Sequence, residues 1–198
     1  MGRAEQREQT RERIVDAAIT AFSDHGFRGA STREIAQRAD VTQGLLTYHF
    51  ASKDELWRAA ADRIFSALRD EVERNTPSRS TSDPRTEARA AIRAYVRFAA
   101  RHPELIRFMV EEGKVGDDRM RWLVSTHLRP IYEGFGALAE VIAPDASPDD
   151  VARLYYVLAG AGSLIFALAP ECAELTDVDP AVDIDAHADL VARLLVPD

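Results

Sequence analysis

The stretch Val41–Phe50, VTQGLLTYHF, sets hydroxyl, amide, phenol and imidazole groups among apolar residues in one short segment. If the segment is helical, Leu46 and Phe50 lie four residues apart and share one face. The residues left facing outward are Gln43, Gly44, Thr47 and Tyr48, with Leu45 and His49 at the borders. Such a helix has one side for a core and another whose hydrogen-bonding groups suit phosphate oxygens and base edges.

The segments around this stretch also predict helices. An apolar stripe of helical spacing runs over about residues 8–25 and ends at Gly26. A helix of about two turns follows, with Ser31 or Thr32 as its N-cap. Ser52–Glu55 reads as a capping box that starts a longer helix. Two short helices joined by a tight turn and laid against a longer one predict a helix-turn-helix module.

This pattern resembles the TetR family of transcriptional regulators. The matching residues are Thr32, Ile35, Ala36, Ala39, Val41, Thr42, Gly44, Leu46, Tyr48, His49, Phe50, Ser52, Lys53, Glu55 and Leu56. With the helix before them, the resemblance covers roughly the first 65 residues. It implies a DNA-binding module followed by a helical domain that binds a small-molecule effector and dimerises.

The resemblance also implies roles for single residues. Thr32, Arg33, Tyr48, His49 and Lys53 are expected to contact DNA phosphates. Base readers are expected among Thr42, Gln43, Gly44 and Leu45, because an amide can pair with adenine and an aliphatic side chain can touch a thymine methyl. Arg3, Arg7 and Arg11 suggest a basic arm, although the glutamates interleaved with them weaken that interpretation.

Two residues depart from the family pattern. Asp40 stands where the family usually has a turn glycine, but aspartate tolerates a left-handed backbone better than most residues, so the turn is expected to survive. Thr47 stands where a tyrosine is common, which puts one phosphate contact in doubt. Thr47 still belongs to the candidate DNA-binding set.

The rest of the chain is also helical in pattern. We expect helices at about Arg85–Arg101, Pro103–Glu112, Asp117–Ala143, Ser147–Leu168 and Asp183–Leu195. Pro130 is expected to kink the third of these. Thr76–Pro84 is polar and bracketed by prolines, which predicts a loop or linker. No segment alternates like a strand, so the fold class is all-α.

The charge distribution divides the chain. The first 63 residues hold ten basic and ten acidic side chains, so the whole net charge of −8 lies after Arg63. We expect residues 1–57 to form the helix-turn-helix DNA-binding domain, with a connecting helix to about residue 75. Residues 76–198 would then form the ligand-binding and dimerisation domain.

The second domain is rich in large aromatic side chains. By resemblance, its helices enclose an effector pocket, as helical bundles commonly do. The candidate pocket residues are Phe98, Met109, Trp122, His127 and Tyr155. Each could equally be an ordinary core residue, because aromatic residues at helical spacing mostly fill cores.

The resemblance further implies a homodimer in which the last two long helices of each subunit pair. The candidate interface residues are Leu164, Ala167, Leu168, Leu190, Val191, Leu194 and Leu195. A two-fold dimer would match a pseudo-palindromic operator in double-stranded DNA.

Other functions find less support in the sequence. There is no Gly-x-Ser-x-Gly elbow, and the single cysteine, Cys172, lies in a predicted loop without a histidine nearby, so we expect no enzyme. Neither a metal nor another cofactor is expected, since Asp183, Asp185, His187 and Asp189 splay around a helix. Without a long apolar run or a signal, we expect a cytoplasmic protein and no membrane partner. A helical dimeric interaction protein without sequence-specific DNA binding remains the alternative.

Overall fold

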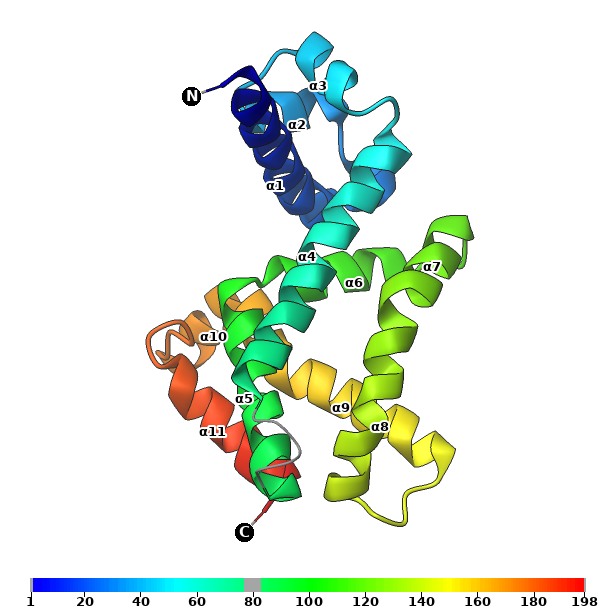
Figure 1. Ribbon diagram of the computed structural model, residues 1–198. Helices are drawn as coiled ribbons and strands as arrows, with labels where there is room; N and C mark the ends of the chain where they lie inside the picture. The colour runs from blue at the N-terminus through cyan, green and yellow to red at the C-terminus, as the bar shows by residue number, and fades with distance from the viewer. Residues whose placement is uncertain (1, 77–82, 198) are drawn as a thin grey trace. The chain divides into compact units, whose positions relative to one another are not determined.

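A computed structural model of the chain describes residues 2–76 and 83–197. Those residues form helices and turns without a strand, so the all-α prediction is confirmed. Most of the linker predicted at Thr76–Pro84, namely residues 77–82, lies outside the described residues. The helices are α1 (Arg3–Gly29), α2 (Thr32–Arg38), α3 (Gln43–His49), α4 (Lys53–Asn75), α5 (Pro84–Arg101), α6 (Glu104–Gly113), α7 (Asp118–Leu123), the π-helix η1 (Val124–Leu128), α8 (Arg129–Ile142), α9 (Pro148–Ala167), α10 (Ala169–Thr176) and α11 (Ile184–Leu195) (Figure 1).

The chain forms two compact units. Unit 1 is Met1–Ser66 with Arg107–Leu123, and unit 2 is Ala67–Ile106 with Val124–Asp198. This division differs from the contiguous one expected from the sequence, because the segment Arg107–Leu123 packs with the helix-turn-helix. Within unit 1, the rings of Phe108 and Trp57 stack with their centroids 5.6 Å apart, and both side chains are fully buried.

The helix-turn-helix in unit 1 follows the predicted lines. Leu46 and Phe50 are 3% and 2% exposed, so the apolar side of α3 is buried as expected. They join a core to which α1 contributes Ile14 and Phe22, and α2 contributes Ile35. Burying a side chain of this size stabilises a fold by about 1.5–3 kcal/mol relative to leaving it exposed.

The ends of these helices have the backbone geometry that their residues favour. Gly26 adopts a φ of +65°, a left-handed conformation open to glycine, and bends α1 there. Asp40 adopts a φ of +52° in the turn between α2 and α3, which confirms that aspartate supports this turn. Ser31 caps α2, because its hydroxyl accepts a hydrogen bond from the Arg33 amide. Thr42 caps α3 in the same way through the Leu45 amide.

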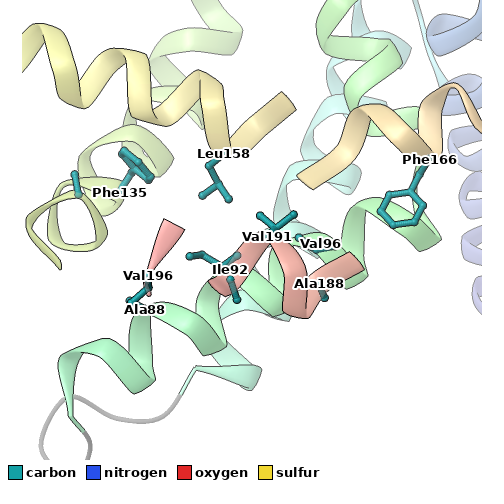
Figure 2. Packing of buried hydrophobic residues seen from close by; sticks show 11 residues of the cluster. Ala88, Ile92, Val96, Phe135, Leu158, Phe166, Ala188, Val191 and Val196 are labelled. Carbon is teal, nitrogen blue, oxygen red and sulfur yellow. The ribbon is translucent and has the colours of Figure 1, made fainter. Parts of the chain in front are cut away.

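Unit 2 has its core where α5, α8, α9 and α11 meet. Figure 2 shows Ile92 and Val96 of α5 lying beside Val191 of α11, with Leu158 of α9 and Phe135 of α8 in the same cluster. Every labelled side chain in this cluster is less than 10% exposed. The core is therefore made by residues that are far apart in the sequence.

One helix prediction and one loop prediction need correction. The helix expected over Asp117–Ala143 consists of α7, a π-helical turn and α8, with Pro130 in the first turn of α8. Proline lacks an amide hydrogen and its ring crowds the preceding turn, so the backbone widens there instead of continuing regularly. Cys172 lies in α10, and the loop predicted around it is wrong, because Pro170 suits a first helical turn.

Candidate functional site

The outward face of α3 is a polar surface of the helix-turn-helix. Thr42, Gln43, Gly44 and Thr47 are exposed, and Tyr48 is 67% exposed despite its large ring. Leu45 is 38% exposed, and His49 is half-buried. The side chains predicted to face outward therefore do so, while α3 rests on its buried Leu46.

The first residues of α2 and α3 are joined by a side-chain hydrogen bond. The amide nitrogen of Gln43 donates to the hydroxyl of Thr32 at 3.1 Å. The Thr32 hydroxyl keeps its own proton for another acceptor, and Gln43 keeps its carbonyl oxygen and a second N–H. This contact places a candidate base reader beside a candidate phosphate ligand.

The hydroxyl of Thr47 is engaged inside its own helix. It donates its proton to the main-chain carbonyl oxygen of Gln43 at 3.0 Å. A phosphate oxygen only accepts hydrogen bonds, so Thr47 in this rotamer has no proton left to offer one. The sequence put a phosphate contact by Thr47 in doubt, and this hydrogen bond gives a geometric reason for that doubt.

Two arginines of α1 extend the polar surface of α3. The guanidinium of Arg7 lies 5.6 Å from the centroid of the Tyr48 ring, and that of Arg11 lies 5.3 Å from the Phe50 ring. Such contacts are within cation–π range. Burial lowers the pKa of His49, and the charges of Arg7 and Arg11 lower it further. The sequence suggested Arg7 and Arg11 as part of a basic arm, an interpretation that the interleaved glutamates weakened. The four-residue spacing of the two arginines places them on one face of α1.

Lys53 and Arg33 mark the starts of two further helices. Arg33 is exposed near the start of α2. The ammonium of Lys53, the first residue of α4, lies 4.8 Å from the centroid of the Phe27 ring. Burial lowers the pKa of Lys53, and the nearby Arg119 guanidinium adds to that effect.

The candidate effector residues are divided between the two units. Met109 and Trp122 belong to unit 1, where the ring centroids of Trp122 and Trp57 are 5.7 Å apart. Phe98, His127 and Tyr155 belong to unit 2. The structure therefore does not bring the five residues together within one unit.

In unit 2, Phe98, His127 and Tyr155 each contact polar or aromatic side chains. His127 is 3% exposed in η1, and its Nδ1 lies 3.3 Å from a guanidinium nitrogen of Arg69. Tyr155 packs edge-on against Tyr132 and Phe135, and burial raises the pKa of its hydroxyl. The ring of Phe98 lies 4.4 Å from that of His102, centroid to centroid, at the end of α5.

A separate hollow of about 370 Å³ lies on unit 2. It is lined by Arg97, Arg101 and residues 181–185, and it includes none of the five candidate effector residues. Arg97 pairs with Asp185 and Arg101 with Glu71, so both guanidinium groups have carboxylate partners.

The candidate dimer residues differ in how far they are exposed. Leu164, Leu168, Leu190 and Leu194 are 50%, 44%, 45% and 71% exposed, and Ala167 and Leu195 are half-buried. Val191 is 3% exposed and belongs to the core of unit 2 (Figure 2), so its assignment to a contact surface is wrong. On one helix, a residue that faces the core leaves residues beside it facing solvent. In α11, Val191 is a residue that faces the core.

Helix α9 carries much of this exposed apolar surface. It is the one described helix long and apolar enough to cross a membrane by length and composition, with a mean hydropathy of 1.2 over 18 residues. Asp149, Asp150 and Arg153 stand near its start, and Leu158 and Phe166 pack into the core of unit 2. Those features are typical of a bundle helix. Within the described ranges, no group of three or more His, Cys, Asp or Glu residues could hold a metal ion.

Comparison with known proteins places the chain among bacterial regulators. Residues 14–60 match the family model described as "Bacterial regulatory proteins, tetR family". The chain is 30% identical over 177 residues to the HTH-type transcriptional regulatory protein RaaS of Mycobacterium tuberculosis strain H37Rv. The matched region covers 88% of this chain and 78% of RaaS. It is 32% identical over 118 residues to the HTH-type transcriptional activator FasR of Mycolicibacterium smegmatis, covering 58% of this chain and 51% of FasR.

The fold is also shared with solved structures. A TetR-like transcriptional regulator from Rhodococcus sp. RHA1 superposes with a TM-score of 0.68 at 23% identity, over 98% of this chain and 96% of that one. The family model matches from within α1 to within α4, a range that includes the candidate DNA-binding residues of α2 and α3 and Lys53. RaaS extends the similarity over most of the chain. The chain is a transcriptional regulator of the helix-turn-helix type and belongs to the TetR family.

Proposed function

We propose that this regulator is a homodimeric repressor that binds a pseudo-palindromic operator and is released by a small-molecule effector. The observation that carries the proposal is the outward face of α3, which presents polar side chains above a buried Leu46 and Phe50. Surface residues that serve only solubility are mostly charged, whereas this face combines an amide, hydroxyls, a phenol and an imidazole. These are the groups that hydrogen-bond base edges and phosphates.

The DNA-binding role divides the residues by what they would contact. A recognition helix lies in the major groove and reads bases mainly with its first residues. Thr42 caps α3, and Gln43, Gly44 and Leu45 are its first residues. Thr32, Arg33, Tyr48, His49 and Lys53 surround them and would contact phosphates. Arg7 and Arg11 join the phosphate-contacting group, because they lie against the rings at the far end of α3.

Dimerisation would use the exposed leucines of α9 and α11. These two helices pack against each other in unit 2, and α5 and α8 cover their inner sides. Leu164 of α9 and Leu168 just after it, with Leu190 and Leu194 of α11, remain exposed. Burying this apolar surface against a second copy would remove it from water. A two-fold dimer then presents two recognition helices to two operator half-sites.

Release by an effector would act through the helices of unit 2. The proposal confines the effector contacts to Phe98, His127 and Tyr155, since Met109 and Trp122 pack within unit 1. The π-helical turn that holds His127 is an irregularity of the kind found at functional positions in helices. An effector lowers DNA affinity only if it binds the DNA-free state more tightly than the DNA-bound state.

The test is a selection of binding sites from a random-sequence duplex library by the purified full-length protein. We expect a palindromic consensus whose half-sites lie about one helical turn, or a multiple of it, apart. Salt-sensitive binding without a preferred sequence, or no binding by a folded dimer, would contradict the proposal. Gln43→Ala should change which bases are preferred. If only the affinity falls, Gln43 is not a base reader.

A further inference from the structure

The ring of Phe27 is shared by two cations from different parts of unit 1. Phe27 follows Gly26, whose left-handed backbone turns the chain at this point. The Lys53 ammonium lies 4.8 Å from the ring centroid, and the Arg119 guanidinium lies 3.8 Å from it. Lys53 begins α4 of the helix-turn-helix, whereas Arg119 belongs to α7 in the segment Arg107–Leu123. Lys53 is also a proposed phosphate ligand.

Several contacts hold Arg119 on this ring. Its side chain is only 16% exposed, and its Nε lies 3.6 Å from an Oε2 oxygen of Glu112. A second carboxylate, that of Asp117, pairs with the other end of the guanidinium. Only the Asp117 pair is also a hydrogen bond, and the buried Nε beside Glu112 has no hydrogen-bond partner among the described residues. An ion pair that also hydrogen-bonds fixes geometry more firmly than either interaction alone. Arg119 is therefore a well-positioned cation.

Glu112 connects this cation to the turn at the end of α1. Its side chain is almost completely buried, and its Oε1 accepts a hydrogen bond from the Phe27 amide at 3.1 Å. Burial raises the pKa of Glu112, against the opposing effects of the Phe27 amide and the Arg119 charge. A buried carboxylate is costly unless a cation compensates it. Arg119 supplies that charge.

This arrangement leaves the charge of Lys53 uncommitted. Across the described part of the chain, no carboxylate forms an ion pair with Lys53, although Glu112 contacts the same Phe27 that Lys53 packs on. We propose that Arg119 is a positioning residue for DNA binding, which occupies Glu112 and the Phe27 ring and so keeps the Lys53 ammonium unpaired and directed at a DNA phosphate. The inference rests on the proposed DNA-binding role of Lys53.

The proposal predicts a distinctive effect of removing Arg119. With Arg119 gone, Glu112 and Asp117 both lose their cation. Glu112 is the one that hydrogen-bonds Phe27, and it attracts the Lys53 ammonium away from DNA. Removing the charge of Glu112 as well removes that attraction, and a glutamine there still accepts the Phe27 amide. Loss of Arg119 alone is therefore harmful to DNA binding, while loss of both charges is not.

The experiment measures binding of the full-length protein to a mixed-sequence DNA duplex by fluorescence anisotropy over a range of salt concentrations. Each phosphate contact contributes about 0.9 to the slope of log K against log salt. Lys53→Ala should lower the slope by about 0.9 for each phosphate that the lysine neutralises. Arg119→Met should lower the slope by a similar amount. The double variant Lys53→Ala/Arg119→Met should have the same slope as Lys53→Ala alone. The double variant Glu112→Gln/Arg119→Met should recover the wild-type slope.

A matched control lies two residues along the same helix. Arg121 is 69% exposed and pairs with Asp118, so Arg121→Met removes the same charge from α7 away from Phe27. It should leave the slope of wild type unchanged. Trp57 and Trp122, the two tryptophans of the chain, both lie in unit 1, so their fluorescence reports whether each variant keeps that unit folded. Should Arg119→Met not fold, Arg119→Lys replaces it, with an expected slope between those of wild type and Lys53→Ala.

The possible results separate the inference from the function beneath it. A wild-type protein that does not bind DNA, or a Lys53→Ala slope equal to that of wild type, contradicts the proposed role of Lys53. If Lys53→Ala lowers the slope while the folded Arg119 variant behaves as wild type, only the inference is overturned. Additive losses in Lys53→Ala/Arg119→Met would show that Arg119 contacts DNA by itself. A slope that stays low in Glu112→Gln/Arg119→Met would also overturn the inference about Arg119.

Discussion

Replacing Gly162 with alanine tests how closely α5 and α9 pack in unit 2. A Cβ at this position would lie 2.5 Å from Cε1 and 2.9 Å from Cδ1 of Tyr95. Non-bonded carbon atoms ordinarily meet at about 3.5–4.0 Å, so the ring must move by about 1 Å. Its freedom to do so is small, because the Tyr95 hydroxyl donates to the Ala159 carbonyl at 3.0 Å. The same Cβ would lie 3.3 Å from a methyl group of Val96.

The expected cost comes from these contacts. Overpacking a core usually costs about 1–3 kcal/mol, and losing the Tyr95 hydrogen bond would add about 0.5–1.5 kcal/mol. The exchange of glycine for alanine inside a helix offsets part of this cost, because it stabilises the helix by about 1 kcal/mol. We therefore expect Gly162→Ala to lower the free energy of unfolding of unit 2 by about 1–3 kcal/mol.

The measurement is urea denaturation followed by circular dichroism at 222 nm, at one fixed protein concentration. Gly134→Ala is the matched control, because Gly134 is an exposed position of α8 where a Cβ meets nothing within 4 Å. It should gain stability by up to about 1 kcal/mol. Tyr95→Phe frees the ring, so Gly162→Ala should cost less in that background. If Gly162→Ala is as stable as Gly134→Ala, α5 and α9 do not pack closely enough at Gly162 to exclude a methyl group.

Three further predictions concern the dimer, the DNA surface and the turn. Leu194 is 71% exposed, and Leu194→Glu should make the protein monomeric by light scattering, whereas Val110→Glu in unit 1 should not; a dimeric Leu194→Glu would rule out the proposed interface. His49 has a lowered pKa and is neutral at pH 7, so a phosphate contact that favours its protonated form should strengthen DNA binding as pH falls below 7. His49→Gln should lose that part of the pH dependence, and identical pH profiles would exclude the contact. Asp40 has a φ of +52°, so Asp40→Ala should destabilise unit 1 by about 1 kcal/mol relative to Asp40→Gly in tryptophan-monitored unfolding, and equal midpoints would refute this.

The sequence alone was sufficient for the helix-turn-helix, because local interactions determine it. Capping residues such as Ser31 and Thr42, a four-residue apolar repeat such as Leu46 and Phe50, and a turn residue that tolerates positive φ act over a few positions. Their effects are visible in a short stretch of chain. The outward face of α3 could be predicted for the same reason, since the positions of the buried residues determine which neighbours are exposed.

Packing between distant segments determined the features that depend on residues far apart in the chain. The sequence could not show that Arg107–Leu123 packs with the helix-turn-helix, that Glu112 accepts the Phe27 amide, or that Arg7 lies against Tyr48. Nor could it distinguish Val191, which faces the core, from Leu190 and Leu194, which do not, since all three are aliphatic residues of one helix. Periodicity gives the faces of a helix, whereas the partner of each face depends on how distant helices pack, and for Val191 that partner is the α5 surface formed by Ile92 and Val96.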